Sequence, residues 1–101
     1  MKYLVIDAMF SGTGIRDYYD GNYIEPENLH LSDMTIDKIR DWLSRYISEH
    51  HKGYINNEAI SQLDREGKEI ALKIKSELVD VKIHYYSDAR MTKEIISSKV
   101  E

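Results

Sequence analysis

Residues 60–78 read ISQLDREGKEIALKIKSEL, and their apolar side chains recur at the spacing of one face of a helix. Asn57 lies just before this run and can cap the helix, with Glu58 in its first turn. We therefore expect a helix over residues 58–78. Gly67 falls in the middle of the apolar face, where a glycine costs about 1 kcal/mol relative to alanine. We expect it to permit a close backbone approach there.

A second helix is predicted over residues 33–52, with Ser32 as its N-cap and Gly53 just beyond its end. Its apolar face has the same kind of spacing and comprises Ile36, Ile39, Leu43, Tyr46, Ile47 and His50. Trp42 lies at the edge of that face, so we expect it to be half-buried. Two helices with matching faces and a short connection should pack as an antiparallel pair.

Strands are predicted on either side of this helix pair. Residues 3–6 form a continuous apolar run, and residues 81–86 alternate, with Val81, Ile83 and Tyr85 toward the core and Lys82, His84 and Tyr86 outward. Residues 22–25 suit a short edge strand, and residues 92–97 a last helical turn. We predict an α+β fold in which a small sheet of two or three strands is covered by the helix pair, in the order β-loop-α-α-β.

Length and composition indicate one globular domain over residues 1–101, since apolar residues make up 42% and charged residues 32%. The chain has no cysteine, which favours a reducing compartment. The first apolar run is too short for a signal peptide and is stopped by Asp7, and no stretch approaches the ~20 apolar residues of a membrane span. We therefore expect a cytoplasmic protein with no membrane partner. The oligomeric state stays open.

The charge is distributed unevenly. The net charge is −4, and the whole excess lies in residues 1–50, which carry five basic and nine acidic side chains. An acidic surface repels nucleic acid and attracts basic proteins, although a charge of this size is also common in soluble domains for solubility alone.

The long connection over residues 8–31 concentrates acids and tyrosines. Tyrosine is enriched at protein interfaces because it offers wide apolar area and a hydroxyl. A surface that stacks nucleic-acid bases would need more cations than Arg16, the one basic residue of this loop. The alternative is that the tyrosines simply cover the sheet. We predict a surface for a basic protein partner, and no nucleic-acid partner, formed by Asp17, Tyr18, Tyr19, Asp20, Tyr23, Glu25 and Glu27.

Two other patterns suggest chemistry. Residues 11–14 (Ser-Gly-Thr-Gly) resemble a phosphate-binding loop faintly, but they lack the remaining glycines and the helix of such loops, so a turn with special backbone angles is the better interpretation. Asp7 and Asp88 end the two predicted strands and would approach each other if these strands are neighbours. A carboxylate pair of this kind can hold a divalent metal, and it can equally serve in turns. No cofactor or bound metal is expected from any other pattern.

Three stretches together resemble small bacterial immunity proteins of contact-dependent growth inhibition systems. They are residues 3–17 (YLVID…SGTGIRD), residues 64–71 (DREGKEIA) and residues 85–91 (YYSDARM). The resemblance implies a cytoplasmic protein that binds a toxin domain, often a basic nuclease. It assigns no binding residue.

We therefore expect a protein that is not an enzyme and that neutralises a cognate basic toxin domain by covering its active site or an exosite. Two other hypotheses stay open. One is a small metal-dependent hydrolase or nuclease that uses Asp7 and Asp88. The other is a regulatory module or homo-oligomer.

Overall fold

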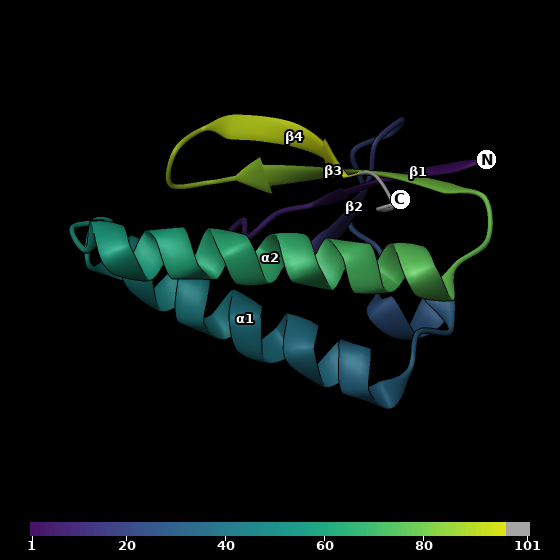
Figure 1. The fold of residues 1–101 in the computed structure, drawn as a ribbon, viewed down its shortest axis with the longest axis horizontal. Helices are drawn as coiled ribbons and strands as arrows, with labels where there is room; N and C mark the ends of the chain where they lie inside the picture. Colours follow the sequence, from purple (N-terminus) through teal and green to yellow (C-terminus); the bar gives the residue numbers. More distant parts are fainter. Residues whose placement is uncertain (97–101) are drawn as a thin grey trace, which may run out of the picture.

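A computed structural model describes residues 1–96 and has an α+β fold with a four-stranded mixed sheet and two long helices (Figure 1). The predicted fold class is confirmed, although the sheet has four strands rather than two or three. In chain order the elements are β1 (Lys2–Ile6), β2 (Ile15–Asp17), the 3-10 helix η1 (Pro26–Leu29), α1 (Asp33–His51), α2 (Asn57–Glu77), β3 (Val81–Ser87) and β4 (Thr92–Ile96).

Both helices begin at side-chain caps. The Ser32 side chain accepts a hydrogen bond from the backbone N–H of Thr35, as the sequence predicts. The second cap is Asn56 rather than Asn57, and its side-chain oxygen accepts from the backbone N–H of Ala59 at 3.0 Å. Either asparagine can cap a helix through its side-chain oxygen, so the sequence alone does not distinguish them. The backbone conformation places Asn56 at the cap. No helix among residues 1–96 is long and apolar enough to cross a membrane.

The sheet order is β2-β1-β3-β4, with β1 and β3 parallel at the centre and antiparallel strands on both sides. The predicted helical turn over residues 92–97 is wrong within the described residues, because Thr92–Ile96 pair with β3 as a strand; Ser97 lies outside them. The predicted edge strand over residues 22–25 is reduced to one isolated bridge, between Arg16 and Tyr23. β2 supplies the outer strand on this side instead.

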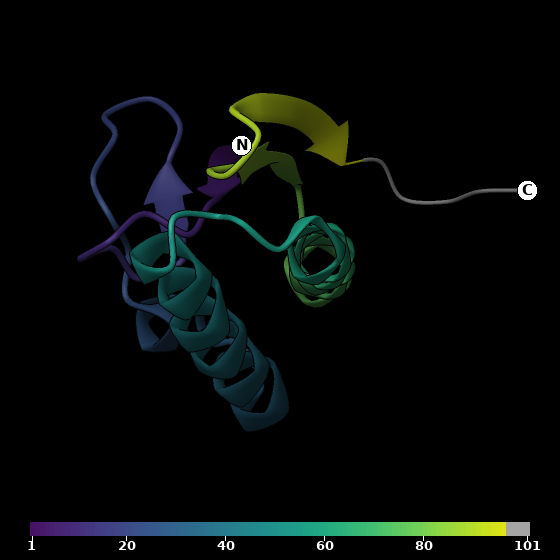
Figure 2. The same ribbon diagram turned by 90° about the vertical axis from the view of Figure 1, so that its left-hand side faces the viewer.

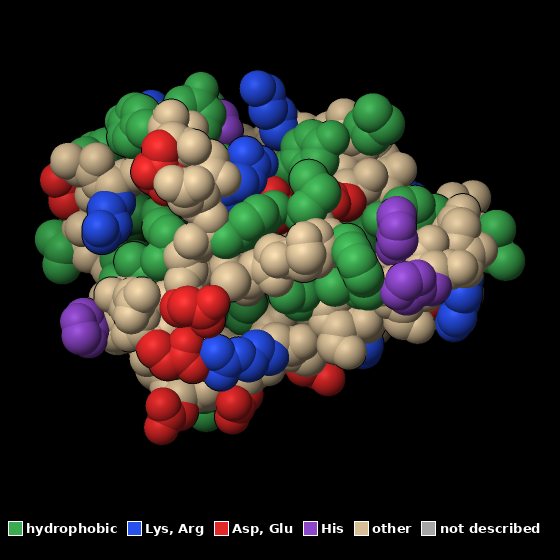
Figure 3. Space-filling view, turned by 180° about the vertical axis from the view of Figure 1, so that it is seen from behind, with side chains coloured by type: hydrophobic (Ala, Val, Ile, Leu, Met, Phe, Trp, Pro, Cys, Tyr) green, Lys and Arg blue, Asp and Glu red, His purple; other side chains and the backbone are tan. Residues whose placement is uncertain are grey.

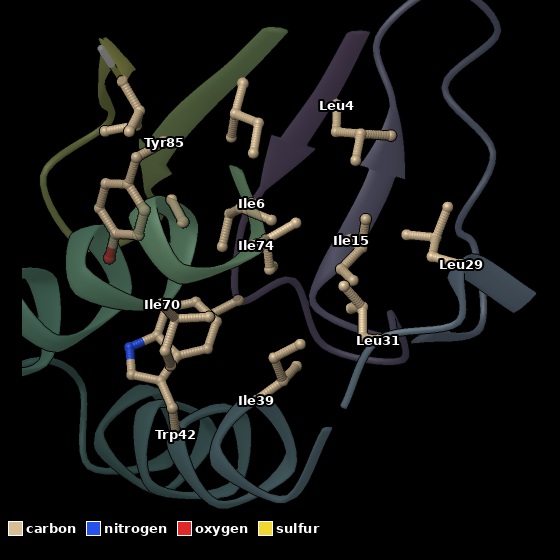
Figure 4. Packing of buried hydrophobic residues seen from close by; sticks show 14 of the residues in the cluster. Leu4, Ile6, Ile15, Leu29, Leu31, Ile39, Trp42, Ile70, Ile74 and Tyr85 are labelled. Atoms are coloured by element: carbon tan, nitrogen blue, oxygen red, sulfur yellow. The ribbon is translucent and has the colours of Figure 1, made fainter. Parts of the chain in front are cut away.

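The helix pair covers one face of the sheet, and the hydrophobic core lies between the two layers (Figure 2). Figure 4 shows Ile6 and Ile74 near the middle of this core, with the indole ring of Trp42 beneath them. Trp42 is fully buried rather than half-buried, and its Nε1 donates a hydrogen bond to the backbone oxygen of Leu63 at 2.8 Å. Because that bond satisfies its one polar atom, the whole ring can be buried between the helices.

Gly67 of α2 lies directly against β3. A Cβ atom built there would stand 2.3 Å from the ring of Tyr85, so only glycine leaves room for this tyrosine. The close approach predicted from the sequence exists, but the neighbour is a side chain rather than a backbone.

Candidate functional site

The predicted partner-binding segment forms a hairpin that continues β2. The backbone N–H of Asp17 donates to the oxygen of Asn22, and that of Ile24 donates to the oxygen of Ile15, both at 2.9 Å. Figure 2 shows this loop standing past the edge of the sheet, away from the helices. We call residues 17–22 the hairpin tip.

Two carboxylates build the turn of the hairpin tip. Asp17 Oδ2 accepts from the backbone N–H of Asp20 at 3.2 Å, and Asp20 Oδ1 accepts from that of Asn22 at 2.8 Å. Asp residues commonly fix turns in this way. Among residues 1–96, neither Asp17 nor Asp20 forms an ion pair with a basic side chain; Asp20 is exposed and Asp17 is partly exposed.

Two tyrosines of the hairpin tip are exposed as predicted. The side chains of Tyr18 and Tyr19 are 44% and 69% exposed. Tyr18 stacks on Tyr3 of β1 with ring centroids 4.0 Å apart, and Tyr19 meets Tyr3 edge to face. These contacts hold the rings in place, so a partner would meet a pre-ordered aromatic surface.

Tyr23 has a different environment, since it is half-buried and its hydroxyl donates to Asp7 Oδ1 at 2.9 Å. Arg16 donates from Nε to the other oxygen of Asp7 at 2.9 Å, and Asp7 is completely buried. Burial and the adjacent Asp7 raise the pKa of Tyr23 above its usual range. Tyr23 and Arg16 therefore compensate a buried carboxylate and anchor the hairpin to β1.

Glu25 and Glu27 lie apart from the hairpin tip, at the start of η1. Both face Arg40 of α1, with N–O distances of 4.0 and 2.6 Å. A hydrogen bond from its own backbone N–H lowers the pKa of Glu27 most, and the hydrogen bond from Arg40 lowers it further. Figure 3 shows acidic side chains gathered around a basic one on this side of the molecule. The seven predicted residues thus divide into the hairpin tip, the half-buried anchor Tyr23, and this paired acidic group.

Asp88, which follows β3, lies near Asp7. Burial first, and then the charge of Asp7, raise the pKa of Asp88 to about 6. One of its oxygens, Oδ1, is buried without a hydrogen-bond partner among the described residues. Within residues 1–96, no three His, Asp or Glu side chains gather closely enough to hold a metal ion. Both oxygens of Asp7 already accept bonds, so the pair offers one free carboxylate at most.

The glycines of residues 11–14 serve the turn after β1. Gly14 has a φ of +95°, which L residues rarely adopt, and its oxygen accepts from the backbone N–H of Asp7 at 3.1 Å. This geometry agrees with the interpretation of the segment as a special turn.

Asp64 of α2 connects two of the stretches that carry the resemblance. It accepts from the hydroxyls of Tyr85 at 2.6 Å, Tyr46 at 2.8 Å and Ser87 at 2.8 Å, and Arg90 Nη1 lies at 3.3 Å. A carboxylate buried to this extent needs such compensation. Asp64 and the three hydroxyls therefore fix the packing of both helices against β3 and are buried, whereas Arg90 is exposed.

The sheet face opposite the helices carries residues that sequence reasoning did not group. Lys82, His84 and Tyr86 of β3 project there, as the alternation predicts, and β4 adds Lys93. His84, Tyr86 and Lys93, together with Tyr18, line a shallow cavity of about 250 Å³, whose remaining lining residues are Val5 and Arg16. The alternation of residues 81–86 predicts the part of this surface that β3 contributes. Lys93 was missed because β4 was not predicted.

Comparison with protein-family models, with curated proteins and with solved structures finds no match. The resemblance to immunity proteins stays a prediction from the three sequence stretches.

Proposed function

We propose that this chain binds a basic toxin domain in the cytoplasm and neutralises it, with the hairpin tip as the principal contact. One observation carries the proposal: exposed Tyr18 and Tyr19 stand beside Asp17 and Asp20, whose charges no basic side chain of residues 1–96 neutralises. Tyrosines of this kind supply contact area, and the unpaired carboxylates attract a cationic surface. Glu25 and Glu27 extend the acidic surface toward α1.

Electrostatic steering gives this arrangement a kinetic signature. Exposed unpaired charges mainly raise the association rate, whereas buried aromatic contacts mainly slow dissociation. The binding partner to test is the protein encoded immediately upstream of the gene for this chain, purified as its C-terminal domain. Association is measured by stopped-flow mixing over a range of salt concentrations.

The double variant Asp17→Asn/Asp20→Asn is expected to associate about tenfold more slowly at low salt, and the difference should shrink toward 1 M salt, where the screening length falls to about 3 Å. The matched control Glu58→Gln/Glu69→Gln removes the same charge from exposed positions of α2 and should change association much less. Equal slowing by both pairs would show that net charge acts alone and that the tip is not the contact.

Tyr19→Ala tests the aromatic part of the same surface. Because Tyr19 is 69% exposed, its loss should leave the stability of the free protein unchanged. We expect dissociation to become at least tenfold faster, which corresponds to about 1.4 kcal/mol. An unchanged dissociation rate would remove Tyr19 from the interface.

The hydrolase hypothesis has one favourable observation, the raised pKa of Asp88 beside Asp7. The full engagement of Asp7 by Arg16 and Tyr23 weighs against it. Thermal melting with increasing Mg²⁺ or Mn²⁺ distinguishes the two functions, since a site filled at 100 times its Kd adds about 2.7 kcal/mol and shifts the Tm by several degrees. We expect no shift. A saturable rise that is lost in Asp88→Asn would favour the hydrolase.

A further inference from the structure

The sheet face turned away from the helices differs in charge from the rest of this acidic chain. By the strand register, the side chains on this face are Tyr3, Val5, Arg16, Lys82, His84, Tyr86, Lys93 and Ile95, and none of these positions holds Asp or Glu. Glu94, the acidic neighbour of Lys93, projects to the opposite face and pairs with Lys68 at 3.0 Å. We call these eight residues, with Tyr18, the open face.

The cations of the open face are available to a ligand. Lys82 and Lys93 are exposed, and neither forms an ion pair within residues 1–96. Lys82 Nζ lies 5.4 Å from the centre of the Tyr3 ring. The positive charge of the two lysines also acts on His84. Burial lowers the pKa of His84 most, and Lys93 and then Lys82 lower it further.

Aromatic rings on the same face contact one another in a fixed arrangement. The Tyr3 hydroxyl lies 2.7 Å from His84 Nε2, and the Tyr3 ring stacks on Tyr18. Tyr18 and Tyr86 line the cavity of about 250 Å³, and Lys93 adds positive charge to its lining, whereas the charge of Arg16 in the same lining is paired with Asp7. This volume is below the ~300–1,000 Å³ of pockets for drug-sized ligands, so it suits a single ring system.

We propose that the open face binds single-stranded nucleic acid, with one base in the cavity lined by Tyr18 and Tyr86 and with adjacent phosphates at Lys82 and Lys93. Bases stack on tyrosine rings, and lysines beside them neutralise the backbone; this combination is what sequence-tolerant single-strand surfaces use. The charge of the face selects an anionic ligand, and the rings select one with flat apolar groups. A basic protein would be repelled by these lysines, so the ligand differs from the proposed toxin, whose acidic contacts lie at the hairpin tip; Tyr18 belongs to both surfaces.

The proposal does not rest on toxin binding, and the two fail separately. Lys82 and Lys93 belong only to the open face, whereas Asp17 and Asp20 belong only to the hairpin tip. The probes are fluorescein-labelled eight-nucleotide oligo-U and oligo-dT, with binding followed by fluorescence anisotropy of the full chain at 20–200 mM salt. Comparing the two oligonucleotides separates RNA from DNA as the source of the strand.

Wild-type protein should bind at least one of the two single strands, and more tightly than a duplex of equal length, whose bases are not free to stack. Lys82→Ala/Lys93→Ala should weaken binding at least tenfold and reduce the slope of log K against log salt by about 1.4, since each single-strand phosphate contact contributes about 0.7. The matched control Lys38→Ala/Lys73→Ala removes two exposed lysines from the helix layer and should change the affinity less than twofold.

Tyr18→Ala and Tyr18→Phe test stacking apart from charge. Loss of the ring should weaken binding about tenfold, whereas phenylalanine keeps the stacking surface and should restore it. Circular dichroism of each variant verifies the fold. No binding of either oligonucleotide at 20 mM salt would overturn the proposal, as would equal losses in both lysine pairs. Binding of a poly-glutamate peptide but of neither oligonucleotide would overturn it in favour of an acidic protein.

Discussion

At the scale of single residues, Asp88 is the group whose ionisation opposes folding most clearly. Burial and the charge of Asp7 raise its pKa from 3.8 to about 6, so the folded protein holds the proton more tightly than the unfolded chain does. The stabilising effect of this proton is fully present below pH 4 and is lost as the pH rises through 6.

Replacing Asp88 with Asn should therefore raise the free energy of unfolding at pH 7.5 and have little effect at pH 4. The measurement is urea unfolding of both proteins at the two pH values. Asp37→Asn is the matched control, because Asp37 is exposed on α1 and should give the same small difference at both. A variant that is less stable than wild type at pH 7.5 would mean that the Asp88 charge is compensated in the folded state.

The buried carboxylate of Asp64 was only partly predictable from the sequence. Asp64 lies four residues after Ile60 and three before Gly67, which is a core position of α2, and a charge at such a position indicates a buried partner network. The apolar pattern alone did not indicate it, because only buried hydroxyls from α1 and β3 make that position tolerable for a carboxylate. These hydroxyls reach Asp64 only when segments that are distant in the sequence pack together.

At the scale of elements, the packing of α2 on β3 depends on the absence of a side chain at Gly67. Gly67→Ala should favour the helix by about 1 kcal/mol through propensity, yet destabilise the protein by about 1–3 kcal/mol net, because the new methyl group displaces the Tyr85 ring. Chemical denaturation measures the change. Gln62→Ala, on the exposed side of the same helix, should leave stability unchanged or slightly raised. A stabilised Gly67→Ala protein would show that Tyr85 moves freely.

The helices could be predicted closely and the outer strands could not. α1 and α2 have long periodic faces and caps, so local chemistry determines them almost to the residue. β2 has three residues and β4 five, and the latter include only two apolar side chains, Ile95 and Ile96. Such short segments become strands because β1 and β3 offer them free edges, which no local pattern records.

At the scale of the whole molecule, the strand order predicts how stability is distributed. β1 and β3 each have two neighbours, whereas β2 and β4 each have one. Amides in the two central strands should therefore exchange with solvent only when the whole protein unfolds, and those of β4 and the hairpin tip should exchange much faster. Hydrogen exchange followed by NMR measures this. Equal protection in β4 and β3 would mean that a further element covers the β4 edge.

The same strand order explains which part of the candidate sites lay beyond sequence reasoning. The hairpin tip is one continuous segment, so its acids and tyrosines could be grouped from the sequence. The open face joins residues 3, 18, 82 and 93, which meet only because β1 lies beside β3 and β3 beside β4. Composition placed the acidic excess in residues 1–50, and the fold separates the charges by face.

The parallel pairing of β1 with β3 also affects how the protein is made. The register places Lys2 beside Val81, 79 residues later in the chain. At ~5–20 residues per second, a ribosome needs roughly 4–16 s to travel that distance, and during this time the first apolar strand has no central partner. During this interval the nascent chain exposes an apolar strand whose backbone has no central partner. Chaperones that bind exposed apolar segments during translation should therefore have their greatest effect on yield at this stage.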